Sequence, residues 1–502
     1  MRKKLKNLFI AISMIALWSL MPSCSKDDNP GSEEEVADSV LFNGNQIGSG
    51  DQEFEIKSSY TLKKGTYILK GWVYVIDGVT LTIEPGTVIK GDKDTKAALI
   101  IERGGKLIAE GTKNEPIVFT SNQSAGSRKP GDWGGVIICG KATNNKREMI
   151  IEGGPRSSHG GDNDDDNSGV MSYVRIEFAG YPFKTDQEIN GLTLGSVGRG
   201  TRMDHIQVSY SNDDSYEWFG GTVDAKYLIA YHGWDDDFDS DNGYRGRIQF
   251  GLVVRNPRIA DKSSSNGLES DNNAEGTTEL PLTKPVFSNI TFLGPKSQDN
   301  LFENTTSYIT GGEYYPGNGS KLGQFQGVMQ IRRSSNLNCY NSVAAGYPVG
   351  LLICNDKGST TQSYATSGAI NLKNLVFSDM TILGSDKDAS FKDSLSTNAS
   401  TFDKNATESF SSSFFKAVNN LNTVYSTISD LKLSQPSSLI ASPNWGPLSN
   451  SPLLNRANLF VDDNLSASFF DRVNFIGAFR SDLLVDNWSA GWANFNPQYT
   501  AY

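Results

Sequence analysis

The chain has 502 residues, of which 50 are glycine and 21% are charged, and its formal net charge is −11. An acidic surface of this kind argues against binding to nucleic acid or to anionic lipid headgroups, and it suits cations or neutral sugars. The glycine content, the many Asn and Asp residues and the weak helical periodicity predict an all-β protein.

The first residues have the pattern of a secretory signal peptide. Four basic residues precede an apolar run from Leu8 to Leu20, which is too short to span a bilayer comfortably, and Cys24 follows. Cys24 resembles the lipidated cysteine of a bacterial lipobox, and the following Ser25-Lys26-Asp27-Asp28 resembles the acidic tag for the outer face of the outer membrane. We therefore expect residues 1–23 to be a lipoprotein signal peptide and Cys24 to carry a lipid; the alternative is a secreted protein with an incidental cysteine. Removal of the four basic residues leaves 42 basic (46 minus four) against 57 acidic residues, a net charge of −15.

Residues 24–49 are polar and acidic, and we expect them to form a flexible tether. No later apolar run is long enough for a membrane helix, so the lipid on Cys24 is the only anchor that the sequence predicts.

The remaining cysteines show neither a CxxC pair nor zinc-ligand spacing. Cys139 and Cys354 adjoin apolar runs, so we expect buried free thiols. A disulfide between Cys339 and Cys354 is the alternative.

Short β-type runs begin near Tyr60, and each ends at Gly, Pro, Asn or Asp. Such a density of short strands fits a parallel β-helix, a sandwich or a propeller. A repeat decides among them, because residues 204–221 align with residues 226–243 at a constant offset of 22. In a β-helix, residues of the same phase stack about 4.8 Å apart. We therefore predict an all-β, right-handed parallel β-helix over residues 50–384.

The repeat predicts two ladders of side chains. The inward ladder, which builds the core, consists of Tyr216, Phe238 and Leu268. The outward ladder consists of three carboxylates, Glu217, Asp239 and Glu269. Stacked like charges repel, so these carboxylates must be protonated, well solvated or neutralised by a cation.

The later chain repeats as well. Residues 286–294 recur as residues 376–384, with a looser copy at residues 341–346. The alignment gives Asn289, Asn341 and Asp379 the same phase, which predicts a structural ladder of turn residues.

The pattern of short β-type runs gives way to helical spacing after residue 384. Residues 385–433 are expected to form a helical insertion or cap, because apolar side chains recur at helical spacing and the open end of a β-helix needs a cover. The apolar side chains are Phe410, Phe414, Phe415, Val418 and Leu421. Residues 434–502 are aromatic, and we expect them to fold back on the end of the solenoid.

Several stretches resemble a family of Bacteroidota β-helix surface lipoproteins. They are GVTLTIEPGTVIKG, DWGGVIICGKA, YVRIEFAG, DDSYEWFGGTV, WDDDFDSDNGYRG and WSAGWANFNPQ, which together sample most of the mature chain. The resemblance implies a pectate-lyase-like solenoid, an outer-membrane location facing the cell exterior, and a TonB-dependent (SusC-like) transporter as a partner. It implies no catalytic residues.

The clearest candidate ligands for a metal ion are four alternating carboxylates: Asp235, Asp237, Asp239 and Asp241. In an extended strand all four share one face, and alternate carboxylates in a turn can converge on Ca²⁺. The spacing differs from an EF-hand, because Gly243 comes one place late and no bidentate Glu follows. A second acidic run lies at residues 162–166. The alternative is a solvated acidic turn, since Asp and Asn are common in tight turns.

An enzyme is the alternative, because many right-handed β-helices are polysaccharide lyases or glycoside hydrolases, although the fold alone does not give the function. A hydrolase needs two carboxylates about 5–10 Å apart, and the stacked coils offer such pairs. The three histidines are scattered and make no triad. The candidate catalytic residues are Glu217, Asp239, Glu269, Asp214 and Asp236.

A third reading is a binding module for sugars, because aromatic side chains flank the carboxylates. Tyr216 and Trp218 share a phase and are expected in the core, whereas turn positions are expected to be exposed. The candidate ligand-binding residues are Trp234, Tyr244, Arg245 and Asp271. The leading interpretation is a cell-surface lipoprotein that captures a glycan or cation, or serves a TonB-dependent uptake system, with calcium as its candidate cofactor.

Overall fold

The computed structural model describes five stretches of the chain: residues 41–183, 189–358, 360–398, 402–434 and 443–502. The predicted signal peptide, Cys24 and the tether up to residue 40 lie outside them. Among the described residues, no helix combines the length and the apolar character needed to cross a membrane.

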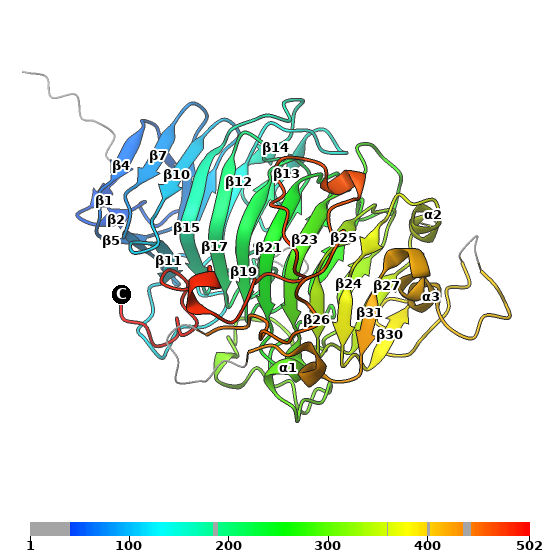
Figure 1. Ribbon diagram of the computed structural model, residues 1–502. Coiled ribbons are helices and arrows are strands. Elements are labelled where there is room, and N and C mark those ends of the chain that lie inside the picture. The colour runs from blue at the N-terminus through cyan, green and yellow to red at the C-terminus, as the bar shows by residue number, and fades with distance from the viewer. Residues whose placement is uncertain (1–40, 184–188, 359, 399–401, 435–442) are drawn as a thin grey trace, which may run out of the picture. The chain divides into compact units, whose positions relative to one another are not determined.

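Two large sheets dominate the fold, and the chain alternates between them in successive coils (Figure 1). In one coil, β17 (Arg202–Ser209) lies in the first sheet and β18 (Tyr216–Phe219) lies in the second. The chain then returns to the first sheet as β19 (Ala225–Tyr231), which pairs with β17 in parallel. The prediction of an all-β parallel β-helix is therefore confirmed.

The first sheet, which we call sheet A, has 18 strands within the described residues and receives one or two from most coils. They are β1 (Leu41–Asn43), β2 (Gln46–Ile47), β4 (Tyr60–Leu62), β5 (Thr66–Leu69), β7 (Thr80–Ile83), β8 (Val88–Gly91), β10 (Lys106–Glu110), β11 (Ile117–Ser121), β15 (Gly169–Glu177), β17, β19, β21 (Arg247–Val254), β23 (Val286–Leu293), β25 (Asn338–Tyr340), β26 (Val343–Ala345), β28 (Leu372–Lys373), β29 (Val376–Ser378) and β31 (Thr423–Tyr425). Within the described residues, strands are thus present from Leu41, ahead of the predicted boundary at residue 50.

The second sheet, which we call sheet B, has 11 strands within the described residues. They are β3 (Phe54–Ile56), β6 (Trp72–Val75), β9 (Ala98–Ile101), β12 (Gly135–Cys139), β16 (Leu192–Gly195), β18, β20 (Phe238–Asp241), β22 (Leu268–Ser270), β24 (Gly327–Ile331), β27 (Val349–Ile353) and β30 (Ile382–Ser385). A separate antiparallel pair is formed by β13 (Met149–Ile150) and β14 (Ser158–His159). The helices are short: α1 (Pro295–Gln298), α2 (Thr361–Thr366) and α3 (Phe410–Lys416), with 3-10 turns η1 (Gly312–Tyr314), η2 (Val418–Asn420), η3 (Ile428–Leu431), η4 (Asp463–Leu465) and η5 (Leu484–Asp486).

The predicted inward ladder is present in sheet B. Tyr216 pairs with Phe238, and Phe238 pairs with Leu268, so each lies directly below the next. All three are fully buried in the main core. Because side chains alternate along a strand, the residues that follow each of them face outward.

The three cysteines of the described chain are free thiols, and all are buried. This outcome confirms the prediction of buried free thiols for Cys139, Cys339 and Cys354, and it excludes the alternative disulfide between the last two in this structure.

The long strands of sheet A bend at a residue with positive φ, and these residues stack from coil to coil. Tyr173, His205 and Tyr227 have φ of 50°, 51° and 59°, and their rings stack with centroids 4.3 and 4.5 Å apart. A left-handed conformation costs about 1–2 kcal/mol in a non-glycine residue, and the stacking of the rings offsets part of that cost.

Further along the same bend, Asn289 and Asn341 occupy successive coils, as the sequence predicts. The third member of the ladder is Asn374 and not Asp379, because the strand register places Asn341 beside Asn374. The predicted alignment matched Val376 to Val286, at the start of β23. In the structure, Val376 belongs instead to the column of Thr291, in the second half of β23. Asp379 instead forms an ion pair with Lys296, at 2.6 Å.

The helix α3 packs over the last coils of the β-helix. The Phe415 ring stacks on Phe377 at 4.3 Å, and Ser409 caps the helix by accepting a hydrogen bond from the Ser412 backbone N–H. The helix is shorter than the apolar spacing predicted. It ends at Lys416, so Val418 is 86% exposed.

The C-terminal residues 443–502, which we call the strap, lie along sheet A and not on the end of the solenoid (Figure 1). Trp492 packs edge-on against Tyr173 and His205, at 5.9 and 5.8 Å. At the far end of the strap, the Arg128 guanidinium donates to the carbonyl groups of Pro497 and Thr500. The strap covers the aromatic bend ladder, which would otherwise present apolar rings to water.

Candidate metal centre

Carboxylates form an outward column on sheet B. Glu217 in β18 pairs with Asp239 in β20, and Asp239 pairs with Glu269 in β22. Each follows a fully buried member of the inward ladder, so the alternation of the strand turns it outward. The register of the predicted carboxylate ladder is therefore confirmed.

Two further residues lie beside Glu217 and Asp239: Asp214 from the turn before β18, and Asn190 from the preceding coil. One oxygen each from Asp214, Glu217 and Asp239 lies within 4.8 Å of the other two. Glu217 is only 6% exposed and Asp214 only 8%. The Asn190 amide, which precedes β16 and is buried, donates a hydrogen bond to Glu217. We call these four residues the acidic site.

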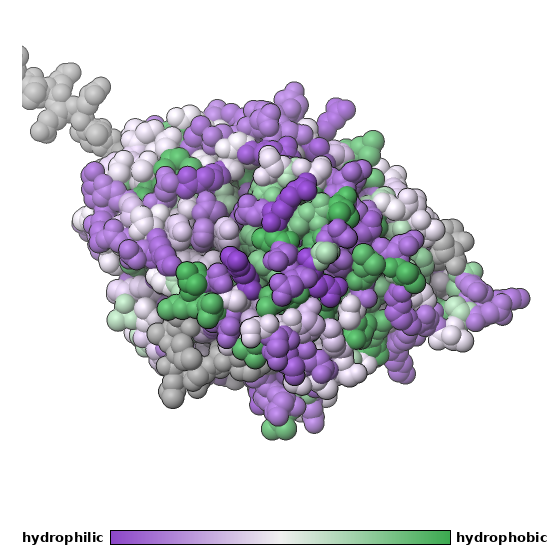
Figure 2. Space-filling model, in the orientation of Figure 1, coloured by the Kyte–Doolittle hydropathy of each residue, from purple (hydrophilic) through white to green (hydrophobic). Residues whose placement is uncertain are grey.

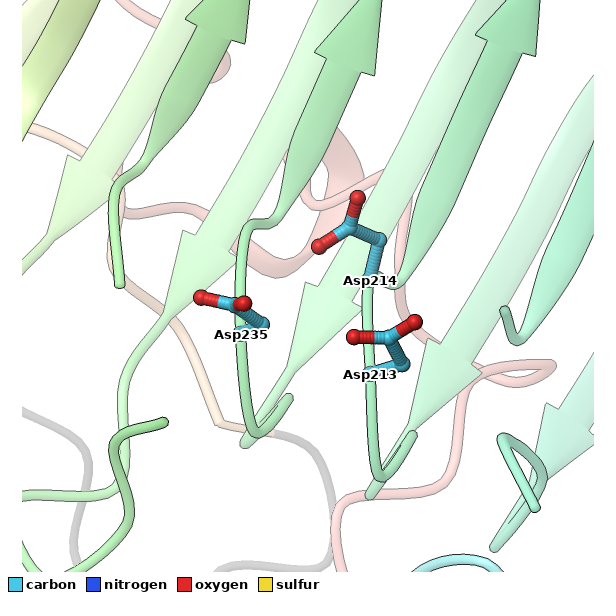
Figure 3. A group of neighbouring side chains, drawn as sticks. All are labelled: Asp213, Asp214 and Asp235. Carbon is cyan, nitrogen blue, oxygen red and sulfur yellow. The ribbon is translucent and has the colours of Figure 1, made fainter. Parts of the chain in front are cut away.

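A second group adjoins the acidic site and shares Asp214 with it. Oxygens of Asp213, Asp214 and Asp235 also lie within 4.8 Å of one another. Figure 3 shows that the first two come from the turn before β18 and that the third comes from the equivalent turn one coil later. The Ser263 hydroxyl donates a hydrogen bond to Asp235. Stacking of equivalent turns thus gathers carboxylates that are 22 residues apart in sequence.

Burial makes this group of carboxylates hard to ionise together. It raises the pKa of Asp214, Glu217 and Asp239 well above the usual range, and repulsion from neighbouring carboxylates raises each pKa further. Burial, followed by repulsion from Asp261, raises the pKa of Asp235 to about 8. At neutral pH these groups must therefore hold protons or bind a cation.

The second half of the column is balanced by arginines. Arg332, from the coil of β24, donates to Glu269 and to both oxygens of Asp271, at 3.0 and 3.2 Å in the latter case. Arg333 lies 2.6 Å from Asp271 as well. Asp271 is thus held in ion pairs and is only 4% exposed, so it is not free to bind a ligand as predicted. The excess of negative charge is concentrated at the acidic site.

Two carboxylates of the turns hold the backbone of the next coil. Asp214 accepts a hydrogen bond of 2.8 Å from the Asp236 backbone N–H, and Asp236 accepts one from the Asn266 backbone N–H. Asp236 is 5% exposed and is occupied by this contact. The structure therefore assigns Asp236 to the turn and not to the predicted catalytic pair with Asp214.

The four alternating aspartates do not share one face, contrary to the prediction. β20 begins only at Phe238, so Asp235 and Asp237 lie in the turn before the strand. Asp237 points toward Arg255, with 3.0 Å between Oδ2 and Nη1, and both side chains are fully buried. Only Asp239 and Asp241 lie on the outward face of the strand.

The predicted aromatic ligands are buried, and the predicted arginine ligand is half-buried and held in an ion pair. Trp234 and Tyr244 are fully buried, and each donates a hydrogen bond, to Asp261 and to the Val223 carbonyl respectively. A later loop covers Trp234, which clusters with Ile259 and Leu322, whereas Tyr244 lies in the main core and stacks on Trp218. Arg245 pairs with Asp164 of the second acidic run, at 3.2 Å, so that run serves to fix its loop.

Asn190 and Arg332 were not found from the sequence. Asn190 precedes the copies of the repeat that align, and Arg332 follows an insertion that separates β22 from β24. The pairing of Leu268 with Met329 would have revealed Arg332, but the offset of 61 residues hides it.

The donor set of the acidic site suits a hard cation. All its possible ligands are oxygens, as Ca²⁺ prefers. Asp239 Oδ1 and Asn190 Oδ1 are buried and accept no hydrogen bond from the described residues. A buried acceptor without a partner is costly, and coordination to a cation would satisfy both. The residues present therefore fit calcium.

A family model described as "Pectate-lyase like beta helix domain" matches residues 54–419. The matched stretch runs from β3 to η2 and contains every carboxylate described above. No curated protein and no solved structure matches the chain significantly.

Proposed function

The chain belongs to the family of pectate-lyase-like β-helix domains, and we propose that it is a surface lipoprotein that binds calcium at the acidic site and captures an extracellular glycan there. The observation that carries this proposal is the approach of the Asp214, Glu217 and Asp239 oxygens to within 4.8 Å of one another. Their charges are unbalanced, whereas Arg332 balances those of Glu269 nearby.

Calcium fits better than magnesium on two grounds. The candidate ligands are three carboxylates, which calcium accepts at variable angles, and the Asn190 side-chain oxygen is a further buried acceptor without a partner among the described residues. Magnesium demands a tighter octahedron and keeps most of its waters, for which buried carboxylates leave little room.

A sugar is the proposed ligand because one exposed tyrosine lies near the turn that carries Asp235. Tyr315 is 44% exposed, and its ring lies 6.2 Å from that of Trp234, which precedes Asp235 directly. An exposed tyrosine can stack on the apolar face of a sugar.

The proposed location is the outer face of the outer membrane, with a lipid on Cys24. The support is the signal-peptide pattern that ends at this cysteine. A TonB-dependent (SusC-like) transporter is the proposed partner, to which the captured glycan would be passed.

The test is thermal melting in EDTA and in millimolar calcium. A ligand that binds only the folded protein stabilises it by about 2.7 kcal/mol at 100 times Kd, so we expect a melting point that is a few degrees higher in calcium and less raised in magnesium. Asp239→Asn should lose most of this gain. Asp77→Asn, an exposed carboxylate outside the site, is the matched control and should keep it. Identical melting curves of the native protein with and without calcium would refute the proposal.

An enzyme is the second candidate, and one observation favours it. The Glu217 and Asp239 oxygens lie within 4.8 Å of each other, so they are no farther apart than the two carboxyl groups of retaining glycosidases, about 5–5.5 Å, and a carboxyl with a raised pKa can act as the acid. Release of reducing ends or unsaturated sugars from a polysaccharide, abolished by Glu217→Gln, would favour catalysis. Glycan binding without any product would favour capture.

A further inference from the structure

The strap contains a hollow of about 550 Å³ that is rich in arginine. Arg456, Arg472 and Arg480 line it, together with Asn458 and Asn474. The strap lies along sheet A, whereas the acidic site lies on sheet B. Figure 2 shows hydrophilic side chains beside hydrophobic ones on the face that the strap crosses in Figure 1.

The three guanidinium groups form no ion pair with any described residue. The guanidinium of Arg456 donates only a long hydrogen bond, 3.5 Å, to the Pro452 carbonyl. The chain is acidic overall, with 57 acidic against 46 basic residues, so three neighbouring arginines without a carboxylate are unexpected. Like charges placed together repel each other, and this arrangement therefore calls for an anionic partner.

Two carboxylates close to the arginines in the sequence are held elsewhere, and Asp482, two residues after Arg480, forms no ion pair with any described residue. Asp471 precedes Arg472 directly, but it lies 2.8 Å from Lys226 of sheet A. Asp462 lies 2.7 Å from Lys373 of the same sheet. These two ion pairs attach the strap to the solenoid and leave the arginines without a partner.

The walls of the hollow are fixed in place. Sheet A binds the strap on both sides of it, since Asn289 donates to the Phe475 carbonyl and Asn341 donates to the Leu459 carbonyl, both at 3.0 Å. The two stretches of the strap are joined by a 2.7 Å hydrogen bond from the Arg456 N–H to the Asn474 carbonyl. Phe460 and Phe475 are nearly buried and give the hollow an apolar floor. A ligand would meet a preorganised site, which reduces the entropic cost of binding.

We infer that this hollow binds the carboxylate or sulfate groups of an acidic oligosaccharide. Guanidinium groups bind such anions through paired N–H donors. The volume lies within the range of about 300–1,000 Å³ that is usual for small-molecule sites, and the apolar floor offers a surface for sugar C–H groups. An anionic membrane is disfavoured as the partner, because the net charge of the chain repels it. The inference does not depend on the proposed calcium site.

The experiment is titration calorimetry of the mature full-length protein in detergent with an oligouronate and with a neutral oligosaccharide of equal length. EDTA is present throughout, so that the acidic site contributes nothing. We expect the oligouronate to bind and its affinity to fall with added salt. In the Arg472→Gln, Arg480→Gln double variant the affinity should fall at least tenfold. Both side chains are exposed, and an unchanged melting point would verify that the variant is folded.

Arg202→Gln is the matched control, because it removes an exposed arginine of sheet A outside the hollow. It should bind like the native protein. Equal binding of the double variant, or equal binding of the neutral oligosaccharide, would overturn the inference. Binding of inorganic sulfate or of anionic lipid vesicles without binding of the oligouronate would overturn it too, and would assign the hollow to a free anion or to a membrane.

Discussion

Arg255 and Asp237 form an ion pair that is completely buried, with 3.0 Å between Nη1 and Oδ2 and no exposed surface on either side chain. Arg255 also donates a 2.6 Å hydrogen bond to the Asp235 carbonyl. This pair fixes the turn that precedes β20, so it sets where the carboxylates of the next strand emerge.

Removal of one partner should be costly. We expect Asp237→Asn to lower the free energy of unfolding by about 3–5 kcal/mol, because it leaves the Arg255 charge buried without a counter-ion. Chemical denaturation followed by fluorescence measures the loss. The double variant Asp237→Leu, Arg255→Met should recover most of it, since buried ion pairs can be replaced by apolar side chains. A single variant as stable as the native protein would show that water reaches the guanidinium.

The pH dependence of stability should report on His159. Burial lowers the pKa of this histidine to about 4, from a usual 6.5. Below pH 6.5 the unfolded chain binds a proton that the folded protein resists, so the contribution of His159 to stability is lost as the pH falls toward 4. The loss should approach about 3 kcal/mol. The measurement is the difference in stability between the native protein and His159→Gln from pH 7 to 4. A difference that does not change with pH would contradict the prediction.

The attachment of the strap can be tested at its most buried aromatic residue. Trp492 is 1% exposed and packs against the bend ladder of sheet A. Trp492→Ala should cost about 3–5 kcal/mol. Val485→Ala, at a position of the strap that is 87% exposed, should change stability by less than about 0.5 kcal/mol. Equal effects of the two substitutions would mean that the strap contributes little to the fold.

The proposed lipid anchor depends on one residue, Cys24, outside the described part of the chain. We expect Cys24→Ala to release the protein from the membrane fraction or to leave its precursor unprocessed. Fractionation of cells with an immunoblot distinguishes the two forms. A variant that still matures and sediments with outer membranes would contradict the lipobox reading.

The stacking of coils was predictable because it repeats. Tyr216 and Phe238 are 22 residues apart, and the same offset places Glu217 over Asp239, so one alignment gives both the core and the outward column. A solenoid has few other ways to bury an aromatic residue in every coil.

The contacts between turns and distant loops were not predictable. The partner of Asp237 directly follows β21 in the next coil, and the partner of Asp271 follows a long insertion. Turn residues such as Trp234 look exposed in the sequence, yet a later loop covers this one. Repeats encode what each coil shares with its neighbours, whereas these contacts occur once.

The coils of a solenoid normally contact only their neighbours, so such a fold can fray from either end, one coil at a time. The strap removes that freedom here. It binds Lys373 near the last coils and reaches Lys90 near the first, through Asp462 and Tyr502. Unfolding of a coil at one end must therefore detach the strap, which also binds the coils near the other end. The whole solenoid should therefore unfold as a single cooperative unit. During synthesis, the complete native fold can form only after the strap, up to Tyr502, has left the ribosome.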